Sequence, residues 1–313
     1  MLKLIARKIA ALIILLPLLN AVGFFYATIH PRLFTPAFGN VSVPDHPDYL
    51  TYIRGLFRGD LGIIARQVTV AEVIIEPLKN SLILVSVSLV VAVVLGVVLG
   101  LSAVSRKTRR MRPSALVFFS AGSSMPGFIL GGMLLSAMVY QTLYAGARQT
   151  LLPISGFGLD EHLILPVLVL SLHPMLNIAK VTSSLLEHEL QQDYIRVARG
   201  KGLGWWMLLW RHAVPNMIAP VLVTIGEAMR LIVGALVIVE PIFIWPGIGR
   251  IFLFTIGLRL DARPPGIYFG SPPLLAAIVV ILGFFLLFAD LLTSVLIYWA
   301  DPRMSKMGED GVR

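Results

Sequence analysis

Three stretches of this chain are long enough and apolar enough to cross a membrane, and they constrain the fold more than any other feature. Ile9–Ile29, Ser81–Val104 and Ser114–Tyr140 contain no Asp, Glu, Lys or Arg. Each exceeds the roughly 18–20 apolar residues that a helix needs to span a hydrocarbon layer about 30 Å thick. Only 14% of all residues are charged, against about 25% in a typical soluble domain. The sequence therefore predicts an all-α, polytopic membrane protein.

The simplest count is six transmembrane helices. We expect them at about residues 9–29, 80–104, 114–140, 163–183, 217–239 and 273–299. The third to fifth spans contain prolines, which membrane helices tolerate where neighbours or water satisfy the freed carbonyl groups. Such residues allow kinks and close helix packing. A water-lined path and tight packing alone are both open interpretations of this pattern.

The basic residues are spread unevenly between the predicted spans. Most of them lie in the N-terminus, in residues 105–112, in the 180–212 region and in the C-terminal tail. Because cytoplasmic loops carry an excess of Lys and Arg, both termini, the 105–112 loop and the 184–216 loop are predicted to be cytoplasmic. This orientation agrees with six spans. The N-terminal apolar run is too long for a typical signal peptide, and we expect it to be retained as the first span.

The segment between the first two spans contains one candidate helix. Within Asp48–Phe57, the side chains that share one side are Tyr49, Tyr52, Ile53 and Leu56. This spacing predicts a short amphipathic helix at the membrane surface.

Composition argues against several function classes. There is no cysteine, which excludes disulfides and cysteine-based metal or redox sites. The histidines are too scattered to predict a metal cluster, and His173, beside Pro174, is expected to be a core residue rather than a ligand. No Ser/His/Asp grouping has the context of a catalytic site. The net charge of +9 is explained by basic cytoplasmic loops, without nucleic acid as a partner.

The most unusual stretch is residues 193–215, DYIRVARGKGLGWWMLLWRHAVP. A phosphate-binding loop requires G-x-x-x-x-G-K-[ST], and that frame is absent here and elsewhere in the chain. The composition instead predicts a helix up to Ala198, a tight turn at the glycines 200, 202 and 204, and an amphipathic helix at Trp205–His212. Two interpretations stay open: a surface that a partner protein grips, and an ordinary basic loop at the membrane interface.

This stretch resembles the EAA loop of the membrane subunits of bacterial ABC importers. Ala198 matches the second alanine of that pattern, Gly202 its glycine, and Val214-Pro215 its closing Leu-Pro. Arg196, Val197 and His212 depart from it. These departures are typical of the B-type permease subunits of dipeptide, oligopeptide and nickel importers, whose form is close to residues 193–203 of this chain.

The likeness extends over nearly the whole chain. The matching segments are residues 49–62, 124–135, 151–158, 162–172, 239–250, 289–291 and 301–303. One departure is residues 258–273, LRLDARPPGIYFGSPP, which is longer than the linker that relatives have there. We expect it to reshape the outer mouth of the protein.

The resemblance implies a type I ABC importer permease fold with a cytoplasmic coupling helix. Residues 1–79 would form the first span and an extracytoplasmic segment, and residues 80–313 a five-helix core with its EAA-type loop at 184–216. The chain would be a non-catalytic channel subunit in a bacterial inner membrane. Its partners would be a homologous second permease subunit, two subunits that bind ATP and Mg, and an extracytoplasmic binding protein.

The resemblance also implies site residues. Contact with the ATP-binding subunits is expected at Asp193, Tyr194, Arg196, Ala198, Arg199, Lys201, Gly202 and Leu203. The substrate is left open, because relatives handle dipeptides, oligopeptides, nickel chelates, glutathione and some oligosaccharides. The alternative function is an ion- or proton-coupled secondary carrier, a class that favours inverted repeats, of which we find none.

Two charges lie inside the fifth span. Glu227 and Arg230 are three residues apart and therefore neighbours on a helix. Each alone near the middle of the membrane would cost about 2.5–3.5 kcal/mol, so we expect them to pair. Three roles stay open for the pair. It would lock helix packing, line a translocation path together with Met125 and Pro126 and meet the termini of a zwitterionic substrate, or form a cytoplasm-side gate or a link to the partner subunit. Asp290 in the last span is expected to cap a helix or pair within the bundle, and Glu240 is left without a role.

Overall fold

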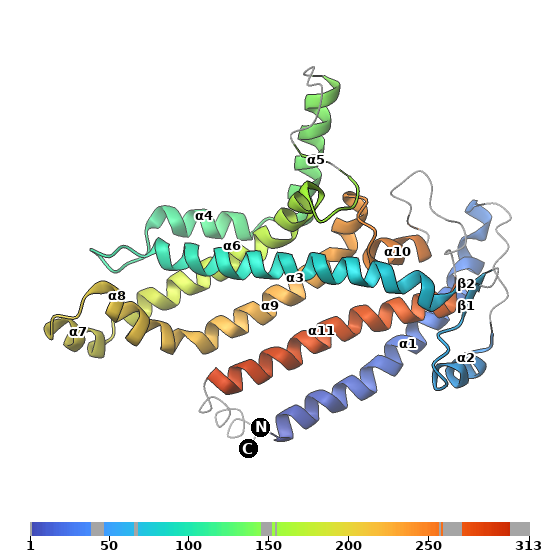
Figure 1. Ribbon diagram of the computed structural model, residues 1–313, viewed down its shortest axis with the longest axis horizontal. Coiled ribbons are helices and arrows are strands. Elements are labelled where there is room, and N and C mark those ends of the chain that lie inside the picture. Colours follow the sequence, from blue (N-terminus) through green and yellow to red (C-terminus); the bar gives the residue numbers. More distant parts are fainter. Residues whose placement is uncertain are drawn as a thin grey trace.

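The computed structural model describes residues 2–38, 47–65, 68–144, 152–153, 155–256, 258 and 271–300. Long helices run side by side along the molecule, with short helices gathered at its two ends (Figure 1). The long helices are α1 (Leu2–Phe38), α3 (Val70–Ala103), α6 (Ile164–Leu190), α9 (Val214–Ile242) and α11 (Pro272–Ala300). The predicted all-α membrane fold is thereby confirmed, because these five helices are long and apolar enough to cross a membrane.

The third predicted span is not one straight helix. It consists of α4 (Pro113–Ser123) and α5 (Gly127–Leu143), which meet at an angle of 87°. Pro126 stands at the break, where its missing N–H and its clash with the preceding residue end the first helix. With this broken pair counted as one span, the described residues contain six spans, as predicted. The third span therefore bends sharply: α5 starts against α6, and its far end projects from the bundle (Figure 1).

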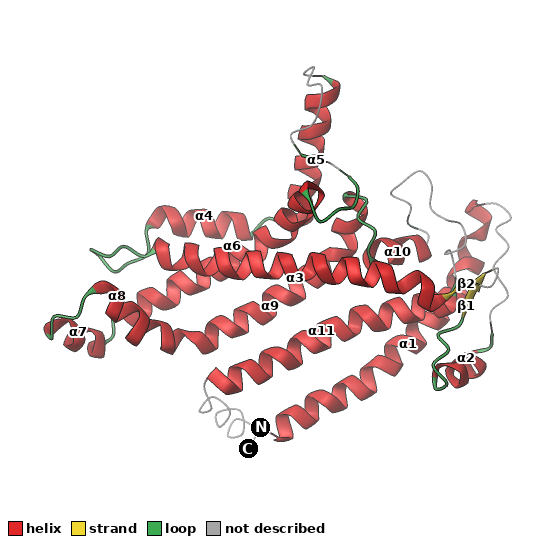
Figure 2. Cartoon of the chain, viewed as in Figure 1, coloured by secondary structure: helices red, strands yellow, loops and turns green. Residues whose placement is uncertain are grey.

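Short elements gather at the end opposite to α7 (Asp193–Gly200) and α8 (Trp205–Leu208). They are α2 (Tyr49–Leu56), the strands β1 (Ile63–Ala65) and β2 (Val68–Thr69), and α10 (Ile248–Thr255). The two strands pair antiparallel as a small hairpin that the sequence pattern did not predict (Figure 2). A single turn of 3₁₀ helix, Glu161–Leu163, leads into α6.

The predicted amphipathic helix is confirmed as α2. Its Tyr52 packs in a buried cluster with Phe24 of α1 and Ala276 of α11, and Tyr49, Ile53 and Leu56 adjoin it. The Asn20 side chain donates a hydrogen bond to the Tyr52 hydroxyl at 3.1 Å. The apolar side of α2 is thus covered by two spans of the same chain.

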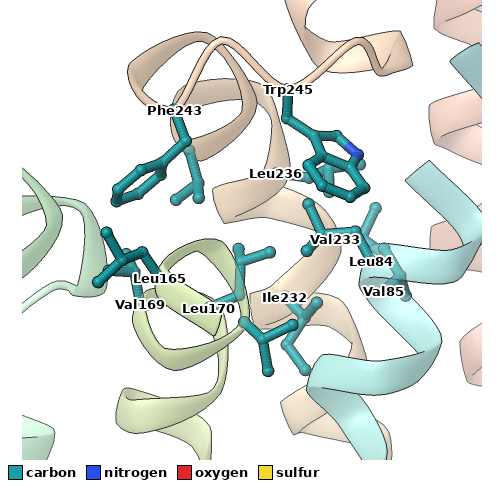
Figure 3. Packing of buried hydrophobic residues seen from close by; sticks show 12 residues of the cluster. Leu84, Val85, Leu165, Val169, Leu170, Ile232, Val233, Leu236, Phe243 and Trp245 are labelled. Atoms are coloured by element: carbon teal, nitrogen blue, oxygen red, sulfur yellow. The ribbon is translucent and has the colours of Figure 1, made fainter. Parts of the chain in front are cut away.

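The largest buried cluster joins α3, α6 and α9 in the half of the molecule near α10 (Figure 3). Its largest side chains are Phe243 and Trp245, which follow α9 and are almost fully buried. Closer to the other end, α3 approaches α6 through glycines. A Cβ on Gly100 would lie 2.7 Å from the Ala179 carbonyl oxygen. Small residues at such contacts let membrane helices pack closely.

Two of the segments predicted to be cytoplasmic, the 105–112 loop and the loop that contains α7 and α8, lie at the same end of the molecule (Figure 1). The 105–112 loop is tied to this end by two contacts. The Met111 amide donates to Glu187 Oε2 at 3.1 Å, and the Arg106 guanidinium stacks over the Trp206 ring at 5.1 Å. Most of the unusual 258–273 loop and all of residues 301–303 lie outside the described part of the chain.

Candidate functional site

The loop at residues 191–213 forms a compact surface at the end of the bundle, which we call the coupling surface. The predicted helix up to Ala198 is interrupted: α6 ends at Leu190, and α7 begins at Asp193. After the turn, α8 continues through a π-helical turn (Leu209–Ala213) directly into α9. Pro215 therefore does not separate two helices: it is the second residue of α9 and directly follows the π-helical turn, within one continuous helix.

The predicted glycine turn is confirmed at Gly202. This residue has φ +80°, a left-handed conformation that only glycine adopts without strain. Its amide donates to the Arg199 carbonyl at 2.8 Å, which closes the C-terminal end of α7. No other atom would lie within 4 Å of a Cβ at Gly202. The turn is therefore open to a partner on its outer side.

One side of α7 is buried and holds the helix on the bundle. Ile195 is fully buried and Ala198 nearly so, in a cluster with Leu186 and Leu190 of α6 and Met217 of α9. Ala198 was predicted to touch an ATP-binding subunit, and its side chain lies in this buried cluster. It therefore helps to seat α7 on the bundle.

The other side of α7 is exposed and basic. The predicted contact residues that lie on the exposed surface are Asp193, Tyr194, Arg196, Arg199, Lys201 and Gly202, with Leu203 partly buried. Arg196 pairs with Asp193 at 3.1 Å, but both side chains are largely exposed, and such a surface pair contributes little to stability. The basic side chains are thus available to acidic groups of another protein.

A polar triad joins α7 to both neighbouring spans. The Tyr194 hydroxyl donates to Glu189 near the end of α6, and the Asn216 side chain of α9 donates to that hydroxyl at 2.9 Å. Partial burial and the hydrogen bond to Glu189 raise the pKa of Tyr194 to about 12. The phenol therefore stays protonated at physiological pH. Sequence reasoning missed Glu189 and Asn216, because neither belongs to a recognisable motif.

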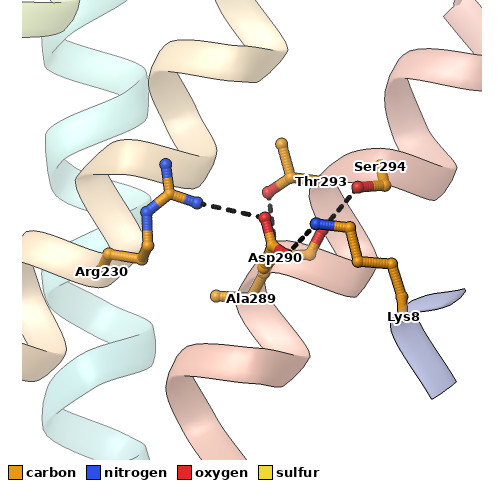
Figure 4. Close-up of polar contacts among 6 residues, drawn as sticks. All are labelled: Lys8, Arg230, Ala289, Asp290, Thr293 and Ser294. Carbon is orange, nitrogen blue, oxygen red and sulfur yellow. Dashed lines mark hydrogen bonds and ion pairs between the residues drawn. The ribbon is translucent and has the colours of Figure 1, made fainter. Parts of the chain in front are cut away.

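The expected ion pair between Glu227 and Arg230 does not form. Arg230 instead contacts Asp290 Oδ1 of α11 at 3.7 Å, and Lys8 of α1 binds the other oxygen of Asp290 (Figure 4). Arg230 turns this way because α11 packs against the same side of α9, where Gly226 adjoins Thr293. The expectation that Asp290 pairs within the bundle is confirmed. Within the described residues Glu227 is exposed and has no polar partner.

Met125 and Pro126, the other predicted path residues, lie exposed at the break between α4 and α5. Among the described residues, no hydrogen bond or ion pair joins them to Arg230, whose partner is Asp290. His173 faces partly inward, and its Nδ1 atom is buried without a hydrogen-bond partner. Among the residues that the structure describes, no group of three or more His, Asp or Glu side chains could hold a metal ion.

Glu240 forms a second polar centre, near the opposite end of the bundle. It is fully buried, and its carboxylate accepts hydrogen bonds from the Ser81 hydroxyl at 2.6 Å and from the Gly249 amide at 2.7 Å. Ser81 in turn accepts from the Ile248 amide at 2.8 Å. These bonds fasten the start of α10 to α3 and α9. The residue that the sequence left without a role thus anchors the start of α10.

Known proteins resemble this chain over most of its length. It is 28% identical over 266 residues to the oligopeptide transport system permease protein AppB of Bacillus subtilis, covering 83% of this chain and 81% of that protein. It is 29% identical over 324 residues to the dipeptide transport system permease protein DppB of Lactococcus lactis, covering 97% and 99%. The glutathione transport system permease protein GsiC of Salmonella paratyphi A is 28% identical over 218 residues, 69% of each chain.

The sequence profile of one family matches residues 92–306, which include α4 to α11 and the coupling surface. Its description is binding-protein-dependent transport system inner membrane component. This match confirms the resemblance first drawn from residues 193–215. The chain therefore belongs to the family of binding-protein-dependent transport system inner membrane components, the membrane subunits of ABC importers with the type I permease fold.

Proposed function

We propose that this chain is a channel-forming subunit of an ATP-driven importer for peptides or related small solutes. The observation that carries the proposal is the coupling surface. Its helix α7 is seated by buried Ile195 and Ala198, and its basic side and the Gly202 turn face outward. The chain would be non-catalytic, because ATP and Mg would be held by partner subunits that dock on this surface.

The relatives support peptides as the solute class. Their names assign oligopeptides, dipeptides and glutathione, which is itself a small peptide. They are all named as permease proteins of transport systems, which favours a subunit of an ATP-driven complex over an ion- or proton-coupled secondary carrier.

The complex we propose has further subunits. A homologous second permease would complete the channel, two ATP-binding subunits would grip the coupling surface, and an extracytoplasmic binding protein would deliver the solute to the 30–79 and 245–272 regions. The chain would lie in the bacterial plasma membrane with both termini cytoplasmic. Support comes from the basic residues of the 105–112 loop and of the coupling surface, which lie at the same end of the molecule (Figure 1). Residues 1–79 would form an N-terminal unit and residues 80–313 the permease core.

The contacts of α7 suggest how ATP hydrolysis reaches the membrane. The triad of Tyr194, Glu189 and Asn216 connects α7 to both α6 and α9. A displacement of α7 by the ATP-binding subunits would therefore move the inner ends of two spans together. Rigid movements of this kind, biased by a ligand at a distant site, can switch a protein between two states. Here the states would be outward- and inward-facing.

Glu227 is the best candidate for the translocation path. It is exposed on α9 within a span, and a charge at that depth is expected to face water or protein rather than lipid. Arg230 contributes less directly, because Asp290 holds its guanidinium. Met125 and Pro126 would line the path at the bend of the third span.

The glycines of this chain offer a matched test of the coupling surface. Gly202 has φ +80° and Gly59 has φ +83°, and a Cβ at either would meet no atom within 4 Å. Gly202→Leu and Gly59→Leu therefore impose similar local strain on opposite sides of the membrane. We expect Gly202→Leu to lower co-purification with the ATP-binding subunits, or transport per ATP hydrolysed, by tenfold or more. Gly59→Leu should change neither. Equal behaviour of the two variants would contradict the proposed docking site.

A further inference from the structure

A row of polar side chains follows α6 through the inner half of its span. The row consists of His173, Asn177, Lys180 and Ser184, spaced three or four residues apart, and all are partly or largely exposed. Residues at this spacing share one face of a helix. Within the described chain no hydrogen bond or ion pair occupies the side chain of Lys180. An unpaired cation thus lies on an open face of a membrane helix.

This face points away from α3. On α3, a Cβ at Gly96 would lie 2.8 Å from the Met175 carbonyl oxygen, and Gly100 is equally close to Ala179 and Thr182. At about 100° per residue, those α6 positions lie roughly 180° around the helix from the polar row. The covered and the open sides of α6 are therefore opposite each other.

Helix α9 has a matching open face. Along it, Val223, Glu227, Leu231 and Gly234 are all exposed or partly exposed, and a Cβ on Gly234 would meet no atom within 4 Å. The buried side of α9 includes Ala228, which packs with Ala92 of α3 and Ile178 of α6. Because α3 covers both α6 and α9 from one side, their open faces lie together on the other side.

Lys180 and Glu227 lie at the same depth in the bundle. Ile178 and Ala228 belong to one buried cluster. Lys180 is two residues from Ile178, and Glu227 is one residue from Ala228. At 1.5 Å per residue, each charged residue therefore lies within about 3 Å of this cluster along its helix axis. No ion pair joins the two among the described residues, and Arg230 does not neutralise Glu227 because it contacts Asp290.

We propose that Lys180 and Glu227 line the translocation path as an opposed pair of charges that accepts a zwitterionic solute, such as a small peptide with free termini. Glu227 would face the ammonium group and Lys180 the carboxylate. This assignment rests on the proposed function, because it deepens the role of the same path. In this arrangement the common open face of α6 and α9 borders a water-filled path, and the second permease subunit leaves that face uncovered.

The absence of cysteine from the chain allows a direct test in the assembled complex. Single cysteines at Val223, one turn from Glu227, and at Asn177, one turn from Lys180, would be labelled in membranes with cationic and anionic methanethiosulfonate reagents. We expect Val223→Cys to react about tenfold faster with the cationic reagent, because one charge in a cleft enriches its counter-ion to that extent. Asn177→Cys should prefer the anionic reagent. Glu227→Gln and Lys180→Met should abolish the respective preferences.

A cysteine at Val98 provides the control. Val98 is exposed on the side of α3 opposite to Gly96 and Gly100, so Val98→Cys should react with neither reagent. The two possible failures differ. Lack of labelling at both Val223→Cys and Asn177→Cys would show that this face is sealed, and would overturn the proposed path. Labelling without charge preference would leave the path in place and overturn the charge pair.

Uptake by the full complex tests the solute class. The probes are trialanine and N-acetyl-trialanine, and the measured quantity is the ratio of their uptake rates. The binding protein is unchanged in every variant, so its preference between the two probes is constant. A change in the ratio therefore reflects a changed preference of the permease. We expect Glu227→Gln to lower the ratio at least threefold, while the exposed Glu76→Gln leaves it unchanged. An unchanged ratio in Glu227→Gln would contradict recognition of the ammonium group, and a wild-type complex that takes up neither probe would contradict the proposed peptide function.

Discussion

Tyr194 and Asn216 are joined by a hydrogen bond of 2.9 Å between the phenolic oxygen and the side-chain amide. The bond connects the short helix α7 to the first turn of a span that continues to the other end of the bundle. With Glu189 accepting from the same hydroxyl, a single side chain of α7 contacts two spans. The triad gives α7 a polar connection in addition to its apolar seat.

Tyr194→Phe should weaken the coupling between ATP hydrolysis and transport. The variant keeps the ring and loses both hydrogen bonds, whose net contribution is about 1 kcal/mol each. We expect the number of solute molecules moved per ATP to fall about fivefold, which corresponds to about 1 kcal/mol of coupling free energy. Assembly of the complex should be retained. Tyr298→Phe is the control, because this tyrosine of α11 has no polar partner among the described residues. Equal coupling in the two variants would contradict the role of the triad.

The spans and the coupling turn could be predicted from the sequence because each depends on local properties. Apolar runs define helices long enough for a membrane, and Gly202 is a residue that a left-handed turn requires. The angle at Pro126 could not be predicted. Proline indicates that a helix ends there, but the size of the bend depends on how Gly127 and Gly131 pack against Val169 of α6.

The partner of Arg230 shows the same limit. Spacing along the helix favoured Glu227, three residues away, whereas the structure pairs Arg230 with Asp290, which is distant in sequence. Glu240 is a similar case, since its hydrogen bonds to Ser81 and Gly249 depend on how three helices meet. Local sequence thus identified the charged residues of the spans, but the choice among possible partners is made by tertiary packing.

Gly247→Ala should destabilise the end of the bundle where α10 lies. A Cβ at Gly247 would overlap the carboxylate of Glu240, which is fully buried and already bonded to Ser81 and two amides of the α10 turn. Overpacking of this kind costs about 1–3 kcal/mol. We expect a lower thermal midpoint for the purified complex. Gly132→Ala, inside α5 where a Cβ would meet no atom within 4 Å, should leave the midpoint at or above that of the wild type. A midpoint in Gly247→Ala that is not lower than that of the wild type would contradict the tight contact.

Gly100→Ala should loosen the contact between α3 and α6. The new methyl group would lie 2.7 Å from the Ala179 carbonyl oxygen, so the helices would have to separate. Alanine is favoured over glycine in a helix by about 1 kcal/mol, which offsets part of the cost. Gly234→Ala gains the same propensity without a clash, because no atom lies within 4 Å of its Cβ. Thermal unfolding should therefore rank Gly234→Ala at or above the wild type and Gly100→Ala below both.

Asp290→Asn should be the most damaging change in the charge cluster of Lys8, Arg230 and Asp290. Asp290 neutralises two cations at once (Figure 4), so its loss leaves both without a counter-charge. The side chains of Lys8, Arg230 and Asp290 are 32%, 39% and 37% exposed. Because water partly screens their charges, we expect Asp290→Asn to lower the free energy of unfolding by about 1–3 kcal/mol, less than the loss of a fully buried pair would. Arg230→Met should cost less, because Lys8 still neutralises Asp290.

The triple variant Lys8→Met, Arg230→Met, Asp290→Asn separates electrostatic pairing from packing. It removes every charge of the cluster and leaves no unpaired ion, and uncharged replacements of an ion cluster are often as stable as the original. We therefore expect it to recover most of the thermal stability that Asp290→Asn alone loses. A triple variant that is less stable than Asp290→Asn would show that the cluster stabilises the bundle through the shape and contacts of its side chains, and not through neutralisation of their charges.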